Sequence, residues 1–394
     1  GTLIVENSTF YSGEADYDGG AIYNRGTVTV TNSTFEDNEA GDDGGAIYNA
    51  GILSVNTSTF TDNSADNDGG AILNDYSVTA EIADSRFENN DAYYGGGAIA
   101  NYGSLTIAKS LFRANWAEDY GGAVYDDGQT IIVRSAFLNN EASPDDGGYG
   151  GAIYGSPLVM NSTFYGNRAE YNGAISGEPV VVFSTIVANK ATGGSEEVGG
   201  IDGGVVKNSI VAGNQPMNCY QWGGIAAQGI NLTDDESCPG FLQVDDVGLV
   251  DTLAMDGSLA LEATSPALGA AVDCTDSQGN PMVTDQRGIL RPQGEACDAG
   301  AYELEGVLAS PLSVSPGRVV DVGNLEWGTS TTVTFTLTNS GFEPVTLSLE
   351  GPFDLGLNGE LDVSTTCASG NLNAGASCQL MLRLTPASAL GIHG

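Results

Sequence analysis

The sequence is poor in basic residues, with one histidine, His393, and 12 lysines and arginines against 51 aspartates and glutamates. The formal charge of −39 repels nucleic acid and anionic lipid, so we expect no nucleic-acid partner. Catalysis by histidine is nearly excluded, because the single imidazole is next to the last residue. No run of 18 or more apolar residues exists, so the sequence predicts no membrane-spanning helix.

Cysteine is also scarce, and its spacing predicts disulfides. The six cysteines fall into three close pairs, none with the CxxC spacing of metal or redox sites. Three local disulfides indicate an oxidising compartment, hence a secreted or cell-surface protein, and they leave no cysteine nucleophile. The predicted pairs are Cys219 with Cys238, Cys274 with Cys297, and Cys367 with Cys378.

A repeat of 22 to 29 residues fills the first half of the chain. An asparagine follows the aromatic position by three residues, at Asn38, Asn63 and their equivalents. Such a unit cannot bury its apolar face alone, so successive coils must stack strand on strand. The repeated position is occupied by Phe10, Phe35, Phe60, Phe87, Phe112, Phe137, Phe164, Ile186 and Val211.

Alternation within each unit predicts strands and no helix. Val28 and Val30 point inward between outward threonines, and two short strands per period result. The paired glycines of the recurring GGAI segment permit positive φ at a corner and close backbone approach. Asn38 and its equivalents suit a turn with left-handed backbone, and stacked asparagines can form amide ladders. The fold class predicted is all-β: a right-handed parallel β-helix.

The GGAI and FxxN repeats, over about residues 1 to 214, resemble those of polymorphic outer-membrane protein passengers. This resemblance implies a bacterial β-helix exposed at the surface and acting in adhesion. We therefore expect residues 1–218 to form β-helix coils.

From Cys219 the repeat fades, and a different resemblance begins. The segments "SPALGA" and "TDQRGILRPQGEACDAGAYE" are similar to the terminal region of secreted β-helix proteins of the choice-of-anchor Q type. We expect residues 219–306 to form irregular terminal coils and a cap with two disulfides. Arg287 and Arg291 beside Asp285 and Asp298 predict a structural ion-pair network, with a ligand-binding or catalytic role as the alternative.

Residues 307–394 show a sandwich pattern. The segment "TTVTFTLTNSGFEPVTLSLEG" contains two alternating strands about a turn. It is similar to the immunoglobulin-like modules of choice-of-anchor D and hydin-type proteins, which implies an Ig-like β-sandwich. We expect this module to be incomplete, because such modules have one more strand after the segment that ends the sequence.

Acidic loops precede the glycine corners and suggest a metal site. Stacked carboxylates about 4.8 Å apart repel by about 3.5 kcal/mol at an effective dielectric of 20. Calcium is the cation that accepts several carboxylates in irregular geometry, so it is the candidate cofactor, while a solvated acidic rim is the alternative. The candidate ligands are Asp16, Asp18, Asp42, Asp43, Asp66 and Asp68.

These features favour an extracellular structural or adhesive solenoid over an enzyme. The expected partner is a surface glycan or protein, or further copies of the chain in a fibre. A polysaccharide lyase or hydrolase remains an alternative, and it needs a cation facing paired carboxylates. The lysines and arginines of the coils are instead scattered over different repeat positions.

Overall fold

The computed structural model describes residues 1–220, 224–305, 312–315, 329–339, 345–347, 359–367, 370–373 and 376–386. The chain divides into two compact units, residues 1–305 and 306–394. The described residues form strands and connecting segments without any α-helix, and none of them forms a helix able to cross a membrane.

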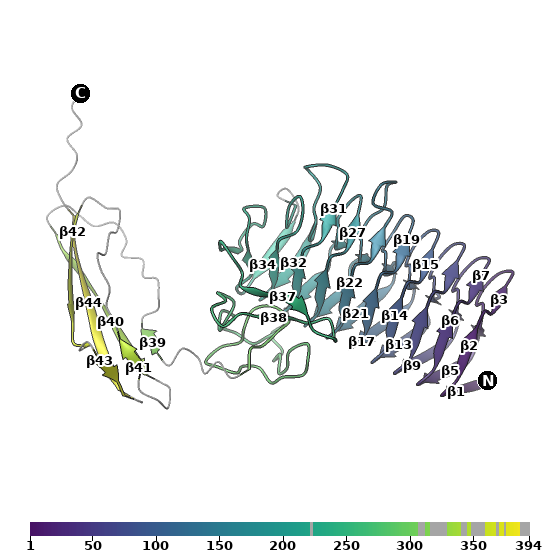
Figure 1. The fold of residues 1–394 in the computed structure, drawn as a ribbon, viewed down its shortest axis with the longest axis horizontal. Helices are drawn as coiled ribbons and strands as arrows, with labels where there is room; N and C mark the ends of the chain where they lie inside the picture. The colour runs from purple at the N-terminus through teal and green to yellow at the C-terminus, as the bar shows by residue number, and fades with distance from the viewer. Residues whose placement is uncertain are drawn as a thin grey trace, which may run out of the picture. The chain divides into compact units, whose positions relative to one another are not determined.

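The first unit is a β-solenoid built from four parallel sheets (Figure 1). The first sheet holds the alternating segments, such as Thr27–Thr31, which pairs in register with Ile52–Asn56. Its strands are β1 (Thr2–Glu6), β5 (Thr27–Thr31), β9 (Ile52–Asn56), β13 (Thr79–Ala83), β17 (Ser104–Ala108), β21 (Gln129–Val133), β25 (Leu158–Met160), β29 (Val180–Val182), β32 (Gly204–Lys207) and β34 (Ile225–Gln228).

The second sheet carries the aromatic position of every coil. Its strands are β2 (Thr9–Tyr11), β6 (Thr34–Glu36), β10 (Thr59–Thr61), β14 (Arg86–Glu88), β18 (Leu111–Arg113), β22 (Ala136–Leu138), β26 (Thr163–Tyr165), β30 (Thr185–Val187), β33 (Ile210–Ala212), β35 (Leu232–Thr233) and β36 (Leu242–Gln243).

Two further sheets complete the coil, so the prediction of two strands per period was wrong. The third consists of two-residue strands, too short for an alternation pattern to reveal: β3 (Glu14–Ala15), β7 (Glu39–Ala40), β11 (Ser64–Ala65), β15 (Asp91–Ala92), β19 (Trp116–Ala117), β23 (Glu141–Ala142), β27 (Arg168–Ala169) and β31 (Lys190–Ala191). The fourth follows the paired glycines: β4 (Ile22–Asn24), β8 (Ile47–Asn49), β12 (Ile72–Asn74), β16 (Ile99–Asn101), β20 (Val124–Asp126), β24 (Ile153–Tyr154) and β28 (Ile175–Ser176).

A column of aromatic rings fills the interior, as predicted. Successive phenylalanine rings from Phe10 to Phe164 stack with centroids 4.7–4.8 Å apart and planes within 5° of parallel. Ile186 and Val211 continue the column in register. Each fully buried ring contributes about 1.5–3 kcal/mol by burial, and adjacent rings add contact energy.

The asparagines three residues after the aromatic position form a buried amide ladder. The Nδ2 group of Asn63 donates to Oδ1 of Asn90 at 2.8 Å and to the carbonyl of Phe35, while its own Oδ1 accepts from Asn38. The predicted ladder is confirmed, but the left-handed backbone lies one residue earlier, for example at Asp37 and Asp62. The turn geometry is therefore supplied by the preceding residue, and the asparagine faces inward.

The paired glycines provide both the positive φ and the close backbone approach that were predicted, and the structure divides these roles between them. The first of each pair has positive φ, for example 66° at Gly96. A Cβ on the second, Gly97, would overlap the backbone oxygens of Trp116 and Gly122 in the next coil. One glycine therefore makes the corner, and the other allows the coils to approach.

The last part of the first unit folds back along the outer face of the second sheet. Strands β37 (Leu249–Leu253) and β38 (Leu259–Leu261) pair antiparallel and lie against the coils near β22 (Figure 1). Leu253 packs against Leu111 and Leu138, which point outward from the second sheet. The terminal segment is thus a cover along several coils.

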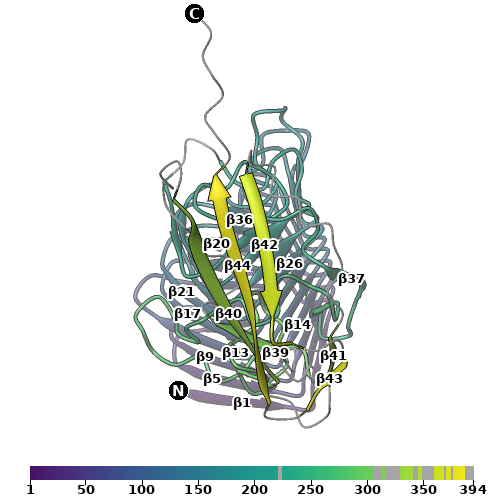
Figure 2. The ribbon, with the colours of Figure 1, turned by 90° about the vertical axis from the view of Figure 1, so that its left-hand side faces the viewer.

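The second unit contains a small antiparallel sheet. Its strand order is β39 (Leu312–Ser315), β40 (Thr331–Asn339), β44 (Ser377–Pro386) and β42 (Gly359–Thr365). Figure 2 shows β40, β44 and β42 side by side. A separate pair joins β41 (Val345–Leu347) to β43 (Gly370–Leu372).

Candidate functional site: an acidic and tyrosine-rich corner

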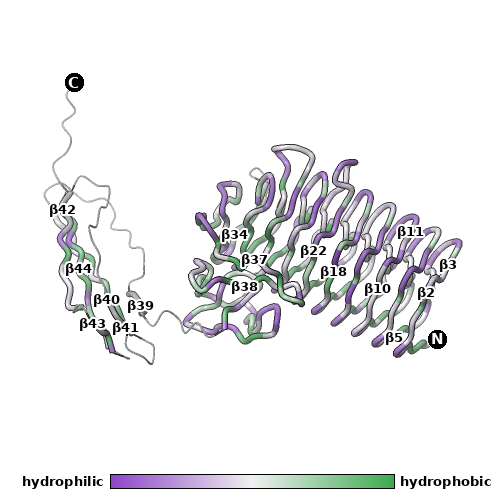
Figure 3. The backbone as a smooth tube through the Cα atoms, in the orientation of Figure 1, coloured by the Kyte–Doolittle hydropathy of each residue, from purple (hydrophilic) through white to green (hydrophobic). Residues whose placement is uncertain are grey.

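The acidic loops form one corner of the solenoid, between the third and fourth sheets, just before the paired glycines. Figure 3 shows the hydrophilic residues of this corner repeated from coil to coil beside β3 and β11. Oδ1 of Asp43 accepts the backbone N–H of Asp68 at 3.1 Å and the Nδ2 group of Asn67 at 2.9 Å. Asp43 therefore stabilises the backbone of the next coil, which offsets part of the repulsion between stacked carboxylates.

Three of the six predicted metal ligands converge. Carboxylate oxygens of Asp18, Asp42 and Asp43 all lie within 4.8 Å of one another. Asp16 and Asp66 are exposed and lie outside this group. They occupy the repeat position of Gly41, two residues before the column of Asp18 and Asp43, which is why their carboxylates do not join it.

The sixth, Asp68, has a different environment. It is buried, with 4 % of its surface exposed, and the hydroxyl of Tyr102 donates a hydrogen bond of 2.6 Å to its Oδ2. Its Oδ1 is buried without a hydrogen-bond partner among the described residues. Asp68 thus belongs to a tyrosine contact and not to the three-carboxylate group.

Burial and repulsion from neighbouring carboxylates raise the pKa of Asp18, Asp43 and Asp68. Burial, aided by the charges of Asp68 and Asp42, raises the pKa of Asp43 to about 6 against the opposing hydrogen bonds. Burial also raises the pKa of Asp18, with a further contribution from Asp42. The pKa of Asp68 is raised by burial, although its hydrogen bond from Tyr102 opposes the shift.

Tyrosines replace the aspartates in the later coils. Asp68 pairs through its backbone with Gly95 of the next coil, and the equivalent residues of the following coils are Tyr120, Tyr149 and Tyr171. A second file on the fourth sheet includes Tyr125 and Tyr154, whose rings lie 5.8 Å apart. Neighbouring centroids in this group are 4.6–6.4 Å apart. We call this set the tyrosine cluster: Tyr94, Tyr102, Tyr120, Tyr125, Tyr149, Tyr154 and Tyr171.

The cluster is partly open to solvent, since Tyr94 and Tyr149 each keep 36 % of their surface exposed. Burial raises the pKa of Tyr125, and nearby carboxylates, Asp127 foremost, raise it further. The Tyr125 phenol therefore stays a neutral hydrogen-bond donor at physiological pH. A half-exposed aromatic surface with flanking carboxylates can bind sugars, or cations, through ring faces and hydrogen bonds.

The basic residues of the coils make local contacts away from the three-carboxylate group. Arg86 pairs with Glu88 at 2.6 Å, and Arg168 with Asp145 at 3.6 Å. Lys207 reaches Asp273 at 3.0 Å and so fastens the terminal segment to the coils. Within the described residues, no ion pair joins a lysine or arginine to Asp18, Asp42 or Asp43.

The arginines of the terminal segment form the predicted ion-pair network. Arg287 contacts Asp285 at 2.8 Å, and the fully buried Arg291 contacts Glu303 at 3.0 Å. The Arg291 guanidinium also donates to the carbonyls of Asp298 and Gly300 and lies 4.6 Å from the ring centroid of Phe183. The carboxylate of Asp298 accepts from the backbone N–H groups of Gly269 and Leu304, so Glu303, which was not among the predicted partners, takes its place beside Arg291.

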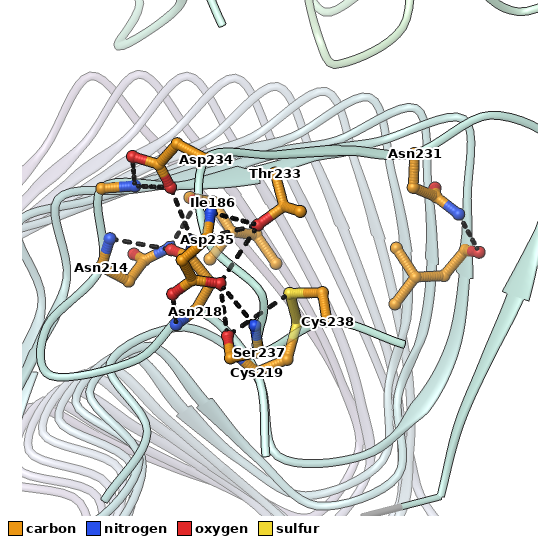
Figure 4. The surroundings of a disulfide bond; sticks show 12 residues. Ile186, Asn214, Asn218, Cys219, Asn231, Thr233, Asp234, Asp235, Ser237 and Cys238 are labelled. Carbon is orange, nitrogen blue, oxygen red and sulfur yellow. Dashed lines mark hydrogen bonds between the residues drawn. A yellow bond between two sulfur atoms is a disulfide. The ribbon is translucent and has the colours of Figure 1, made fainter. Parts of the chain in front are cut away.

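All three predicted disulfides are present, Cys219–Cys238, Cys274–Cys297 and Cys367–Cys378. The first lies at the end of the asparagine ladder (Figure 4). There Asn218 accepts from Asn214 and donates to Asp234 at 2.6 Å. The disulfide thus closes the loop that terminates the regular coils.

Two families match parts of the solenoid. The family described as right handed beta helix region matches residues 1–140, and the Chlamydia polymorphic membrane protein repeat matches residues 134–156. The chain is a β-helix repeat protein similar to these. No curated protein and no solved structure matches it.

Sequence reasoning missed the bond between Tyr102 and Asp68 and the clustering of the tyrosines. Tyr102 comes one residue after the end of β16, and the same repeat position holds Asp75 and Asp127 in the neighbouring coils. Alignment of the repeats therefore does not show where the Tyr102 side chain points. The same repeat position holds Asp68, then Gly95, then Tyr120 in successive coils. This change from aspartate to tyrosine could have indicated that tyrosines gather at the corner.

Proposed function

We propose that this chain is a structural and adhesive element of an extracellular or surface-attached assembly. The observation that carries the proposal is the division of polar groups in the coils. The asparagines three residues after the aromatic position are buried and paired with one another, whereas tyrosines and aspartates gather at one outer corner. The rod is the scaffold, and the tyrosine cluster is the proposed contact surface for a surface glycan or protein.

Secretion or surface display is supported by the three disulfides and by the similarity to the Chlamydia repeat. The antiparallel strands β39, β40, β42 and β44 support the proposal that residues 307–394 form an immunoglobulin-like module. The choice-of-anchor Q type of residues 219–306 is proposed on their sequence motifs alone.

A binding experiment tests the adhesive role. Labelled full-length chain is applied to a glycan array and to whole cells, together with the double variant Tyr94→Ser/Tyr149→Ser. We expect at least fivefold weaker binding for this variant, because two exposed rings are worth about 1 kcal/mol or more. The control variant Tyr11→Ser/Tyr220→Ser removes two exposed rings elsewhere and retains binding. Equal loss in both variants contradicts the assignment of the surface.

Two rival functions give distinct results. Steady cleavage of an acidic polysaccharide by the purified chain supports a lyase or hydrolase and contradicts the adhesive proposal. A mass that grows with concentration, in calcium and in EDTA alike, supports a subunit of an extracellular fibre.

We further propose that Asp18, Asp42 and Asp43 bind Ca²⁺. Their convergence supports it, since Ca²⁺ prefers several carboxylate oxygens in irregular geometry. In thermal unfolding, saturating CaCl₂ relative to EDTA is expected to stabilise the chain by about 2.7 kcal/mol at a hundredfold excess over Kd. Asp18→Asn/Asp42→Asn abolishes the effect, and Glu6→Gln/Glu81→Gln, which removes two exposed acids of the first sheet, preserves it. An unchanged melting temperature in wild type refutes the site.

A further inference from the structure

A separate hollow of about 260 Å³ lies at the end of the second sheet, where the hairpin of β37 and β38 covers that sheet. Its floor is apolar and consists of Val187, Ala212 and Leu259. Tyr165 forms part of its wall. Ligand pockets for drug-sized molecules begin at about 300 Å³, so this volume suits one long side chain or a small amine.

The hollow exists because the side chains at the ends of the second-sheet strands become smaller in the later coils. The strand ends aligned with Leu138 and Tyr165 are Val187 and Ala212, followed by Ala188 and Gly213. The hairpin β37–β38 spans the space that larger side chains fill in earlier coils.

The rim of the hollow is acidic. Asp234, Asp245, Asp246 and Asp251 border it, and among the described residues no lysine or arginine lines it. Asp234 accepts from Asn218 and the N–H of Gly213, and Asp246 accepts from Gly248. Asp245 and Asp251 are both exposed, and neither forms an ion pair with another described residue.

The arrangement of these acids disfavours a compact divalent ion. Within the described part of the chain, the one group of three carboxylates closer than 4.8 Å is Asp18, Asp42 and Asp43. The rim carboxylates are spread around an apolar floor instead. Spread carboxylates around an apolar floor match a cation whose charge lies at the end of an apolar stem, because the stem contacts the floor and the charge reaches the carboxylates.

The chain's own arginines show the same chemistry. The guanidinium of Arg287 lies 3.5 Å from the ring centroid of Tyr302 while it contacts Asp285 and Glu305. Arg25 lies 5.0 Å from the ring centroid of Tyr23. The described residues that line the hollow provide a tyrosine and several carboxylates but no arginine.

We propose that this hollow binds an arginine side chain presented by a partner protein. The methylene stem lies on Val187 and Ala212, the guanidinium meets Tyr165, and the rim carboxylates neutralise it. This inference is independent of the adhesive role of the tyrosine cluster.

The test is a titration of the full-length chain, in EDTA, with the peptide acetyl-Gly-Arg-Gly-amide. Its citrulline counterpart has the same shape without the charge. We expect at least tenfold tighter binding of the arginine peptide, a preference that weakens with added salt. Asp245→Asn/Asp251→Asn is expected to weaken binding about fivefold, since each exposed carboxylate contributes modestly. Both side chains are exposed, so the variant is expected to fold.

The variant Glu6→Gln/Glu81→Gln changes the net charge equally on the first sheet, and it binds like wild type if the rim acids act locally. Equal affinity for both peptides, or no saturable binding up to about 10 mM, overturns the proposal. An equal loss in both double variants also overturns it, because the effect then comes from the overall charge.

Discussion

Tyr102 and Asp68, 34 residues apart in the sequence, share a hydrogen bond of 2.6 Å from hydroxyl to carboxylate. This length is typical of a charge-assisted O–H···O⁻ bond. Because Oδ1 of Asp68 is buried without a hydrogen-bond partner among the described residues, the hydroxyl of Tyr102 is the side-chain donor that this carboxylate relies on.

Substitution Tyr102→Phe removes that donor and keeps the ring. We expect a loss of about 1.5–3 kcal/mol in the free energy of unfolding near pH 8, as for hydrogen bonds to charged groups. The loss shrinks at about pH 4, because the bond from Tyr102 lowers the pKa of Asp68 and a protonated carboxyl needs it less. Urea denaturation at both pH values measures this. A pH-independent loss means that Asp68 is neutral throughout.

The raised pKa of Asp43 predicts a stability window in the absence of calcium. The folded pKa of about 6 exceeds the ordinary value of 3.8, so the folded state binds more protons between these values. Its stabilising contribution is complete below about pH 3.8 and is lost as pH rises through about 6, by about 3 kcal/mol.

The variant Asp43→Asn, measured in EDTA, should flatten that window and raise stability near pH 8, since its Oδ1 still accepts from Asp68. Asp62→Asn, at an exposed corner, is the charge-matched control. A steeper pH dependence in Asp43→Asn than in wild type refutes the assignment.

The phenylalanine column gives a position-dependent prediction. Phe87 is fully buried between Phe60 and Phe112, so Phe87→Ala is expected to cost about 3–5 kcal/mol. Phe10 is only partly buried, and Phe10→Ala should cost less than half as much. Equilibrium unfolding of both variants compares them, and equal costs would mean that the rings do not act through burial.

The second glycine of each pair should tolerate no side chain. Gly97→Ala places a Cβ against backbone oxygens of the next coil, and we expect at least about 2 kcal/mol of destabilisation from the enforced separation. Gly224→Ala, where a Cβ meets nothing within 4 Å, should stay within about 0.5 kcal/mol of wild type. Calorimetry distinguishes the two, and similar melting temperatures contradict the packing explanation.

The repeat itself allowed the core to be predicted. Matching positions in successive coils lie over one another, so alignment of Phe35 with Phe60 already specified a contact. The terminal cover was not predicted, although a signal existed. Outward positions of the second sheet change from Glu36 and Thr61 to Leu138 and Val187, which indicates that something covers them.

The site was less predictable, because each coil departs from the template in its own way. Alignment assigned Asp18, Asp43 and Asp68 to one repeat position and so predicted that they converge. In the structure, Asp68 instead accepts a hydrogen bond from Tyr102, and the third carboxylate of the group is that of Asp42. Side-chain direction depends on partners in neighbouring coils, and a single-coil pattern does not contain it.

The asparagine ladder has a direction. In every asparagine pair of the ladder, the amide of the lower-numbered residue donates to the side-chain oxygen of the higher-numbered one, and the final donor, Asn218, meets the negative charge of Asp234. The donor end of the aligned amide dipoles therefore faces an anion, as the positive N-terminal end of a helix dipole favours a negative charge. A duplicated coil inserted in the middle preserves this polarity and both ends, so the rod can lengthen in evolution by whole units, whereas an inverted unit would set donor against donor.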